Sequence, residues 1–232
     1  MNLSKRSYIE ELLDRNDIPF AEIKKNMQEL GIINTLLGGH KITITAAKKL
    51  IQNKKKITIC EIGCGGGDNL AAIYKSLPKN ISVKYIGIDI KQECIDFAKQ
   101  EAKNNFTAEW IVSDYKDVFF KQKPDIIFSS LFCHHFTEEQ LVHQLKWMKE
   151  NSTTGFFIND LHRHPVAYYA IKLLTTIFSR SYLVKNDAPL SVARGFKKKE
   201  WKKMLVAAGI ANYTIQWKWA FRHLILYRHE QQ

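Results

Sequence analysis

Short apolar runs recur through the middle of the chain and alternate with stretches of helical periodicity. The run at 57–62, ITICEI, is followed by DNLAAIYKSL, whose apolar residues repeat at the spacing of one helix face. Four more runs have the length and the aliphatic content of strands buried in a parallel sheet: 83–90, 108–115, 124–136 and 154–161. Strands that alternate with helices in this way predict an α/β fold with a parallel sheet.

The two ends of the chain have different patterns. Residues 1–50 show helical patches separated by turns, which predicts an N-terminal helical extension ahead of a main domain over 51–232. Gly38 and Gly39 interrupt this region and are typical of a helix C-cap. The stretch TEEQ at 137–140 has the pattern of a capping box and predicts a helix start there. Toward the other end, the sequence YTIQWKWAFRHLILYRH predicts a final hairpin.

A cluster of glycines follows the first apolar run, in the sequence EIGCGGGD at 61–68. Strand, glycine turn and helix in succession are typical of a nucleotide-binding unit, because glycine allows tight turns and close approach of a ligand. The dinucleotide fingerprint does not fit, since its third glycine would fall at Asp68, and no Gly-Lys-Ser/Thr follows for a P-loop. The pattern that fits is acid-x-Gly-x-Gly-x-Gly.

That pattern resembles motif I of the class I S-adenosylmethionine (SAM)-dependent methyltransferases, and the likeness extends over about residues 55–161. It implies a Rossmann-like seven-stranded sheet whose last strand is antiparallel and lies beside the fifth. It also implies that Asp89 binds the ribose hydroxyls and Asp114 the adenine amino group of SAM, since each acid follows an apolar run. The candidate cofactor residues are Glu61, Gly63, Cys64, Gly65, Gly67, Asp89, Ile90, Ser113, Asp114, Tyr115 and Ser130.

The connection at 162–196 is too long for a simple loop. Its segment PVAYYAIKLLTTIFSRSYLV is so apolar that, as one helix, it must be covered by protein or by substrate. By the resemblance, this insertion is predicted to be a helical substrate lid, with Tyr168, Tyr169 and Arg194 as candidate substrate residues. Packing between helices, with no ligand involved, is the alternative.

Methyl transfer to a hydroxyl needs a base with a pKa near neutrality, which points to histidine. Four histidines follow predicted strand ends: His134, His135, His162 and His164. His134 is preferred to its neighbour, because Phe136 indicates that His135 already turns toward the next helix. The stretch LFCHHF resembles the ubiquinone/menaquinone-biosynthesis methyltransferases, and NDLHRHP is similar to methyltransferases of phenolic and polyketide small molecules.

These features predict O-methylation of a phenolic hydroxyl on a hydrophobic aromatic molecule. C-methylation of a quinone precursor remains an alternative, and so does a SAM-binding protein that interacts with RNA. The Asn-Pro-Pro-Tyr/Phe signature of nucleic-acid N-methyltransferases is absent at the fourth run, where SSLF stands at 129–132. This absence counts against a nucleic-acid substrate.

The formal net charge of +12 is concentrated in one part of the chain. Residues 162–232 carry 13 basic and 3 acidic groups, whereas residues 51–161 carry 14 of each. The lysines at 197–203 fit a solvated helix face, a peripheral contact with anionic membranes, or an acidic partner. Four cysteines without metal-ligand spacing or a signal peptide predict reduced thiols, no metal site and a cytoplasmic location. The oligomeric state is left open.

Overall fold

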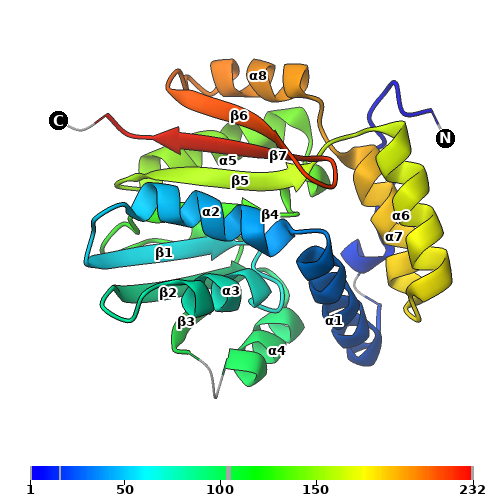
Figure 1. Cartoon of the computed structure of the whole chain (residues 1–232), viewed down its shortest axis with the longest axis horizontal. Helices are drawn as coiled ribbons and strands as arrows, with labels where there is room; N and C mark the ends of the chain where they lie inside the picture. The colour runs from blue at the N-terminus through cyan, green and yellow to red at the C-terminus, as the bar shows by residue number, and fades with distance from the viewer. Residues whose placement is uncertain (1, 16, 103–105, 231–232) are drawn as a thin grey trace.

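Seven strands form one sheet in the computed structural model, which describes residues 2–15, 17–102 and 106–230. The strand order is β3-β2-β1-β4-β5-β7-β6 (Figure 1). The strands are β1 (Lys56–Ile62), β2 (Ser82–Asp89), β3 (Ala108–Val112), β4 (Ile126–Ser130), β5 (Gly155–Leu161), β6 (Tyr213–Lys218) and β7 (Arg222–Arg228). The first five strands are parallel, and β7 pairs antiparallel with both β5 and β6. The predicted Rossmann-like seven-stranded sheet, with its final hairpin beside the fifth strand, is confirmed.

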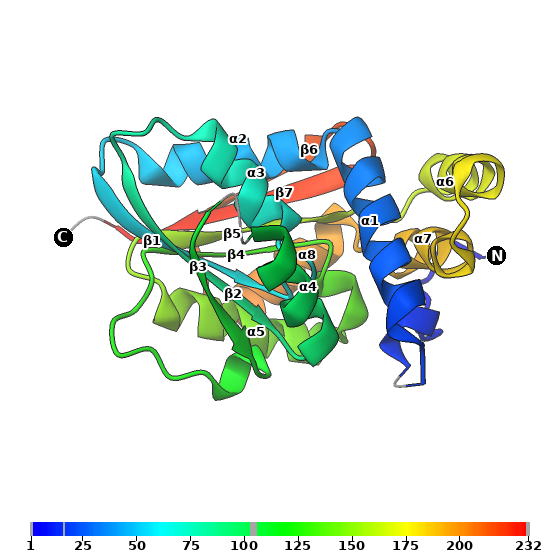
Figure 2. The same ribbon diagram turned by 90° about the horizontal axis from the view of Figure 1, so that it is seen from below.

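Helices cover both faces of the sheet (Figures 1 and 2). On one face α2 (Gly39–Ile51) and α3 (Asp68–Ser76) bury aliphatic side chains against β1 and β4. On the other face α5 (Glu138–Asn151) and α8 (Lys198–Ala207) build a second core around the buried Trp201. α4 (Gln92–Ala102) packs beside β2 and β3. The two cores fix the sheet, so its strand ends are rigid supports for a site.

Three further helices lie beyond the carboxyl ends of the parallel strands (Figure 2). They are α1 (Phe20–Leu36), α6 (Pro165–Phe178) and α7 (Tyr182–Arg194), of which α6 and α7 pack on each other as a hairpin. The insertion is therefore helical, as predicted, but it folds as two helices because the chain turns at 179–181. Glu29 of α1 accepts hydrogen bonds from this turn, including those of the Arg180 and Ser181 N–H groups.

No helix in the described ranges is both long and apolar enough to cross a lipid bilayer.

Two predicted strands are shorter than their apolar runs. The third run ends as a strand at Val112, and Asp114 then caps the 3₁₀ helix η2 (Tyr115–Asp117) by accepting from the Lys116 N–H. The fourth run ends as a strand at Ser130, after which Leu131 adopts a φ of 54° and the chain forms η3 (Cys133–His135). The predicted capping box is confirmed, since Thr137 and Gln140 exchange side-chain to backbone hydrogen bonds at the start of α5.

The segment before α1 is not helical as far as residue 11, which corrects the expectation for this part of residues 1–50. Residues 2–11 run as irregular backbone along α7 and lead into the 3₁₀ helix η1 (Leu12–Asp14). Ser7 donates its N–H to the Ala193 carbonyl, and Asp187 accepts from the N–H groups of Leu12 and Leu13. Because α7 satisfies these backbone groups, the segment needs no helix of its own. The domain division at residue 50 stays a prediction.

Candidate functional site

A cavity of about 1010 Å³ opens where the carboxyl ends of β1, β2 and β4 meet α1 and α4. Carboxyl ends of parallel strands are where ligands bind in open α/β sheets. The size fits a ligand pocket, since such pockets have volumes of roughly 300–1000 Å³. Ten of the eleven predicted cofactor residues line this cavity: Gly63, Cys64, Gly65, Gly67, Asp89, Ile90, Ser113, Asp114, Tyr115 and Ser130.

The glycine loop forms one wall of the cavity. Gly63, Gly65 and Gly67 all have positive φ, of 64°, 49° and 75°. A Cβ on Gly63 would also lie 2.2 Å from the Phe132 ring, whereas one on Gly65 would meet open space. The loop therefore needs glycine at 63 for packing as well as for backbone conformation, and at 65 for conformation alone.

Asp89 stands at the end of β2 with both carboxylate oxygens held by backbone donors. Its Oδ2 accepts from the Gly65 N–H and its Oδ1 from the Lys91 N–H, each at 2.9 Å. Burial raises the pKa of this carboxyl above its ordinary value, and these two hydrogen bonds oppose the rise. Each oxygen keeps a second acceptor site for a ligand. Asp89 thus links the glycine loop to the part of the cavity where a ribose was predicted.

Glu61 differs from the other predicted cofactor residues, because it lies beneath the loop and does not line the cavity. It is fully buried and accepts a hydrogen bond of 3.0 Å from the Asn69 amide of α3. Burial raises its pKa well above the ordinary value, and the nearby Asp68 adds to that rise. In the protonated form this carboxyl can also donate a hydrogen bond. Its place in the structure is to support the loop rather than to touch a ligand.

The structure reverses the expected positions of His134 and His135 relative to the cavity. His135 lines the cavity, whereas His134 is buried behind it with 3 % of its side chain exposed. His134 Nδ1 lies 2.8 Å from Asp160, which also accepts from the N–H groups of Cys133 and Leu161. The preference for His134 rested on the interpretation that His135 already turns toward the next helix. In the structure both histidines lie in the tight turn of η3, and it is His135 that lines the cavity.

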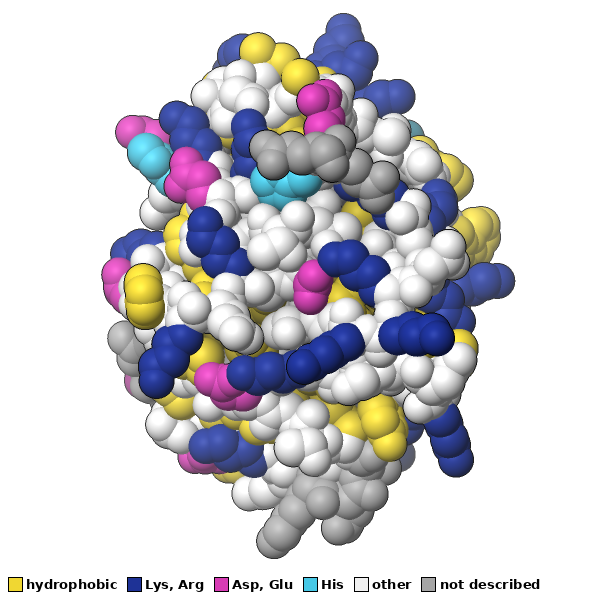
Figure 3. Space-filling view, turned by 90° about the vertical axis from the view of Figure 1, so that its left-hand side faces the viewer, with side chains coloured by type: hydrophobic (Ala, Val, Ile, Leu, Met, Phe, Trp, Pro, Cys, Tyr) yellow, Lys and Arg dark blue, Asp and Glu magenta, His cyan; other side chains and the backbone are white. Residues whose placement is uncertain are grey.

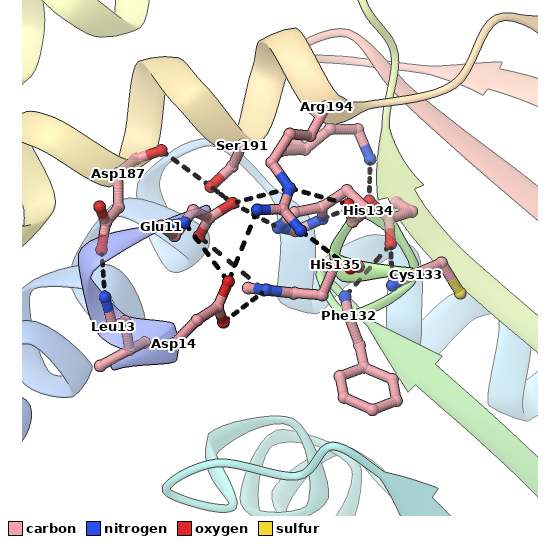
Figure 4. A network of polar contacts seen from close by, with 12 residues as sticks. Glu11, Leu13, Asp14, Phe132, Cys133, His134, His135, Asp187, Ser191 and Arg194 are labelled. Atoms are coloured by element: carbon pink, nitrogen blue, oxygen red, sulfur yellow. Dashed lines mark hydrogen bonds and ion pairs between the residues drawn. The ribbon is translucent and has the colours of Figure 1, made fainter. Parts of the chain in front are cut away.

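His135 belongs to a polar network that the sequence did not predict (Figure 4). Its Nδ1 lies 3.0 Å from Asp14 and its Nε2 lies 3.8 Å from Glu11, both on the N-terminal segment. Glu11 is 4 % exposed and accepts a hydrogen bond from Ser191 of α7. Nothing in the local pattern around Glu11 or Asp14 distinguishes them from other surface acids, because their partners are more than 120 positions away in sequence.

Arg194 holds the network together and does not line the cavity. Its guanidinium donates to the carbonyls of His134, His135 and Ile9, and it lies 3.5 Å from Asp14. These donors are already engaged inside the protein, so this arrangement does not support the predicted contact with substrate. Its position instead joins η3 to the N-terminal segment.

The acids of this network differ in pKa. Burial raises the pKa of Glu11 from 4.5 to about 7, and His135 offsets part of the rise. Burial would also raise the pKa of Asp14, but hydrogen bonding and attraction from His135 outweigh it and lower that pKa below its ordinary value. In Asp160, attraction and hydrogen bonding from His134 likewise outweigh burial, so its pKa is lowered. Glu11 thus titrates near neutrality, whereas Asp14 and Asp160 stay ionised at the same pH.

The other predicted catalytic and substrate residues lie away from the cavity. His162 and His164 line a separate depression with Tyr169, and His164 caps α6 by accepting from the Val166 N–H. Burial, and then His164, lower the pKa of His162. Tyr168 lines neither depression, and no residue from 162 to 196 lines the large cavity in the described part of the chain. The predicted roles of His162, His164, Tyr168 and Tyr169, and the insertion as a cover over substrate, are not supported by this arrangement.

Two polar features of the cavity were not predicted from the sequence. Asn26 of α1 is 1 % exposed and lines the cavity, and neither polar atom of its amide has a hydrogen-bond partner in the protein. His40 and Asp68 face the cavity as a pair joined at 2.6 Å. The sequence did contain a signal for His40, because this residue follows two glycines at the start of a helix. The same two glycines are equally typical of a helix C-cap, so the signal was not decisive.

Glu11, His134 and His135 also bring ligand-type atoms within 4.8 Å of one another, a spacing that a metal ion can bridge. The guanidinium of Arg194 lies 3.9 Å from Glu11 Oε1. That cation offsets part of the carboxylate charge and so weakens the attraction of the cluster for a divalent ion.

A family model described as a methyltransferase domain matches residues 53–209, about two thirds of the chain. The chain belongs to this methyltransferase family. The match covers the glycine loop, the ends of β1 to β5 and the α6–α7 hairpin. A search of curated proteins finds no match.

Solved structures confirm the fold of this methyltransferase. The plantazolicin methyltransferase BpumL in complex with SAH has a TM-score of 0.66 and 19% identity, covering 91% of this chain and 89% of that one. A SAM-dependent methyltransferase from Aquifex aeolicus has a TM-score of 0.59 and 16% identity, covering 91% and 99%. Magnesium protoporphyrin IX methyltransferase from Synechocystis PCC 6803 with bound SAM has a TM-score of 0.56 and 13% identity, covering 84% of this chain and 81% of that one. At these identities the similarity concerns the fold alone.

Replacing Glu11 with glutamine is expected to stabilise the methyltransferase at alkaline pH. The folded pKa of about 7 exceeds the ordinary 4.5, so unfolding releases a proton between these values and stability falls as pH rises through that window. The difference of 2.5 units (7 − 4.5) corresponds to about 3 kcal/mol. Urea unfolding at pH 5 and pH 8 should show that the free energy of unfolding of E11Q increases relative to that of the wild type as the pH rises. The exposed neighbour variant E10Q is the control, and an E11Q advantage independent of pH would contradict the prediction.

Proposed function

We propose that the protein transfers a methyl group from SAM to a hydroxyl group of a hydrophobic aromatic small molecule. The observation that carries the proposal is that one cavity contains both halves of such a site. The glycine loop, Asp89, Asp114 and His135 all line it, together with apolar residues that can contact an aromatic acceptor. Those apolar residues are Leu13, Met27, Leu30, Ile32, Phe132 and Phe136.

The residues present fit SAM as cofactor. Asp89 and Asp114 offer carboxylate oxygens to the nucleoside, and the buried, unpartnered amide of Asn26 needs a ligand partner, which the amino-acid end of SAM can supply. The positive φ of Gly65 keeps the loop free of a side chain beside Asp89. When bound, SAM supplies an electrophilic methyl group on a cationic sulfur.

His135 is the group that removes the acceptor proton in this proposal. It lines the cavity, with Asp14 lying 3.0 Å from its Nδ1 and Glu11 lying 3.8 Å from its Nε2. Burial raises the pKa of Glu11 to about 7, so this carboxyl can share the proton at neutral pH. Phe132 and Phe136 line the same cavity and offer apolar surface to the acceptor. The protein therefore contributes orientation, apolar contact and a proton acceptor.

The experiment that tests the function is incubation with methyl-labelled SAM and a panel of phenols, quinols and bulk RNA. The expected result is label in an apolar phenol as an ether methyl group, which mass spectrometry of the product identifies. Label on ring carbon would replace O-methylation with C-methylation at the same base. Transfer confined to RNA, or no transfer to any acceptor in spite of SAM binding, would contradict the proposal.

A further inference from the structure

Helix α6 is turned with its larger apolar residues outward. Its buried residues are Ala167 and Thr175, which are small. Six of its large apolar side chains are 42–76 % exposed, whereas Tyr168 and Ile171 are partly buried; the six are Val166, Tyr169, Leu173, Leu174, Ile177 and Phe178. A surface helix of a globular protein normally shows the opposite arrangement. A continuous apolar face of this kind marks an interaction site.

The substrate cavity does not account for this face. The cavity is lined from α1, α4, η1 and the strand ends, and α6 packs on α7 at the far side of α1 (Figure 2). In the described residues, α6 packs closely with α7 but with no other helix or strand to a comparable extent. The outward residues are therefore available for a partner outside the chain.

The charges around α6 indicate what that partner is. Lys172, Arg180 and Lys185 are exposed on the hairpin. The hairpin contains one acid, Asp187, which is 5 % exposed and accepts from the N–H groups of Leu12 and Leu13. Exposed lysines continue from Lys198 at the start of α8. Lys and Arg side chains also lie on the surface at the opposite end of the molecule, with acidic and uncharged side chains among them (Figure 3). The feature that distinguishes the hairpin is therefore the combination of basic residues with the exposed apolar face of α6.

We infer that α6 lies in the plane of an acidic lipid surface, with its apolar face inserted and the basic residues at the headgroups. The helix has 14 residues and is about 21 Å long, which is too short to span a bilayer but suits an interfacial helix inserted about 5–10 Å deep. A second copy of the chain fits less well. A twofold contact through this face would bring the basic residues of two hairpins together, with no exposed acid on either hairpin to pair with them.

Sedimentation with vesicles tests the inference on the full chain. Phosphatidylcholine vesicles containing about 30 % phosphatidylglycerol should bind the wild type, and pure phosphatidylcholine should bind it at least about 10-fold more weakly. The variant K172Q/R180Q/K185Q should lose about 100-fold in partitioning to acidic vesicles, given the attraction of each basic residue to such a surface.

A second variant tests the apolar contribution. L173S/I177S/F178S should lose about 30-fold or more in binding to acidic vesicles. Its matched control is F119S/V206S, which changes side chains that are 89 % and 70 % exposed elsewhere and should bind as the wild type does. Unchanged thermal unfolding midpoints show that the variants are folded.

Three outcomes would overturn the inference. The first is no binding of the wild type to acidic vesicles. The second is unchanged binding of L173S/I177S/F178S. The third is a dimer in light scattering that this variant abolishes, which would assign the face to a second copy of the chain. None of these measurements requires methyl transfer, so they stand apart from the outcome of the activity assay.

Discussion

Replacing His135 with alanine is expected to lower kcat by roughly 10²–10⁴-fold while SAM binding is retained. The imidazole lines the cavity and is the base in the proposed reaction, whereas the backbone donors that hold Asp89 come from Gly65 and Lys91 and do not involve His135. The loss should shrink for phenols that are already acidic, because a phenolate needs no base. Steady-state kinetics on a series of phenols of decreasing pKa measures this dependence.

His143 provides a matched control for His135, because it is an exposed histidine on α5 outside the cavity. H143A should keep wild-type kcat. H134A is informative in another way, since His134 touches Asp160 and not the cavity, so its effect should appear mainly as lower stability. Near-wild-type kcat for H135A on a weakly acidic phenol would show that transfer depends on proximity alone.

Replacing Asp89 with alanine is expected to weaken SAM binding by about 2 kcal/mol, which is roughly 30-fold in Kd. The carboxylate is fixed by the N–H groups of Gly65 and Lys91, so its remaining acceptor sites are already oriented before a ribose arrives. Asparagine at this position should cost less, because one oxygen remains. Isothermal titration calorimetry measures both variants.

Asp96 on α4 provides the control for Asp89, since its carboxylate is exposed and bonds only to Gln92 among the hydrogen bonds described. D96A should bind SAM with wild-type affinity. Wild-type affinity for SAM in D89A would remove Asp89 from the cofactor site. Binding of NAD by the wild type without binding of SAM would contradict the cofactor assignment as a whole.

The sheet and the cofactor side of the site could be predicted from the sequence because their signals are local. Apolar runs predict the buried strands, and the glycines and acids that line the cavity lie at or just after the ends of such runs. Gly63 to Gly67 and Asp89 need no long-range information beyond the rule that parallel strands end at one edge of the sheet.

The acceptor side could not be predicted in the same way. Periodicity shows that α6 is apolar, but it does not show which face the fold covers, so the insertion was assigned to substrate. The choice between His134 and His135 depended on where β4 ends, and the strand stops at Ser130 rather than continuing to Phe136. Glu11 and Asp14 meet His135 only in the folded chain.

The contacts between the N-terminal segment and α7 bear on when the protein becomes active during synthesis. Glu11 bonds to Ser191, Ser7 to Ala193 and Arg6 to Arg194, so each pair is separated by about 180 positions. β7 enters the sheet beside β5 only when residues 222–228 have been made. Because synthesis proceeds from the N-terminus, residues 6–11 are made well before their partners in α7 and reach their place only after those partners have been made. A growing chain can assemble the glycine loop and Asp89 early, but it lacks the ordered surroundings of His135 until α7 has emerged. Catalytic competence should therefore appear only after α7 and β7 have been synthesised.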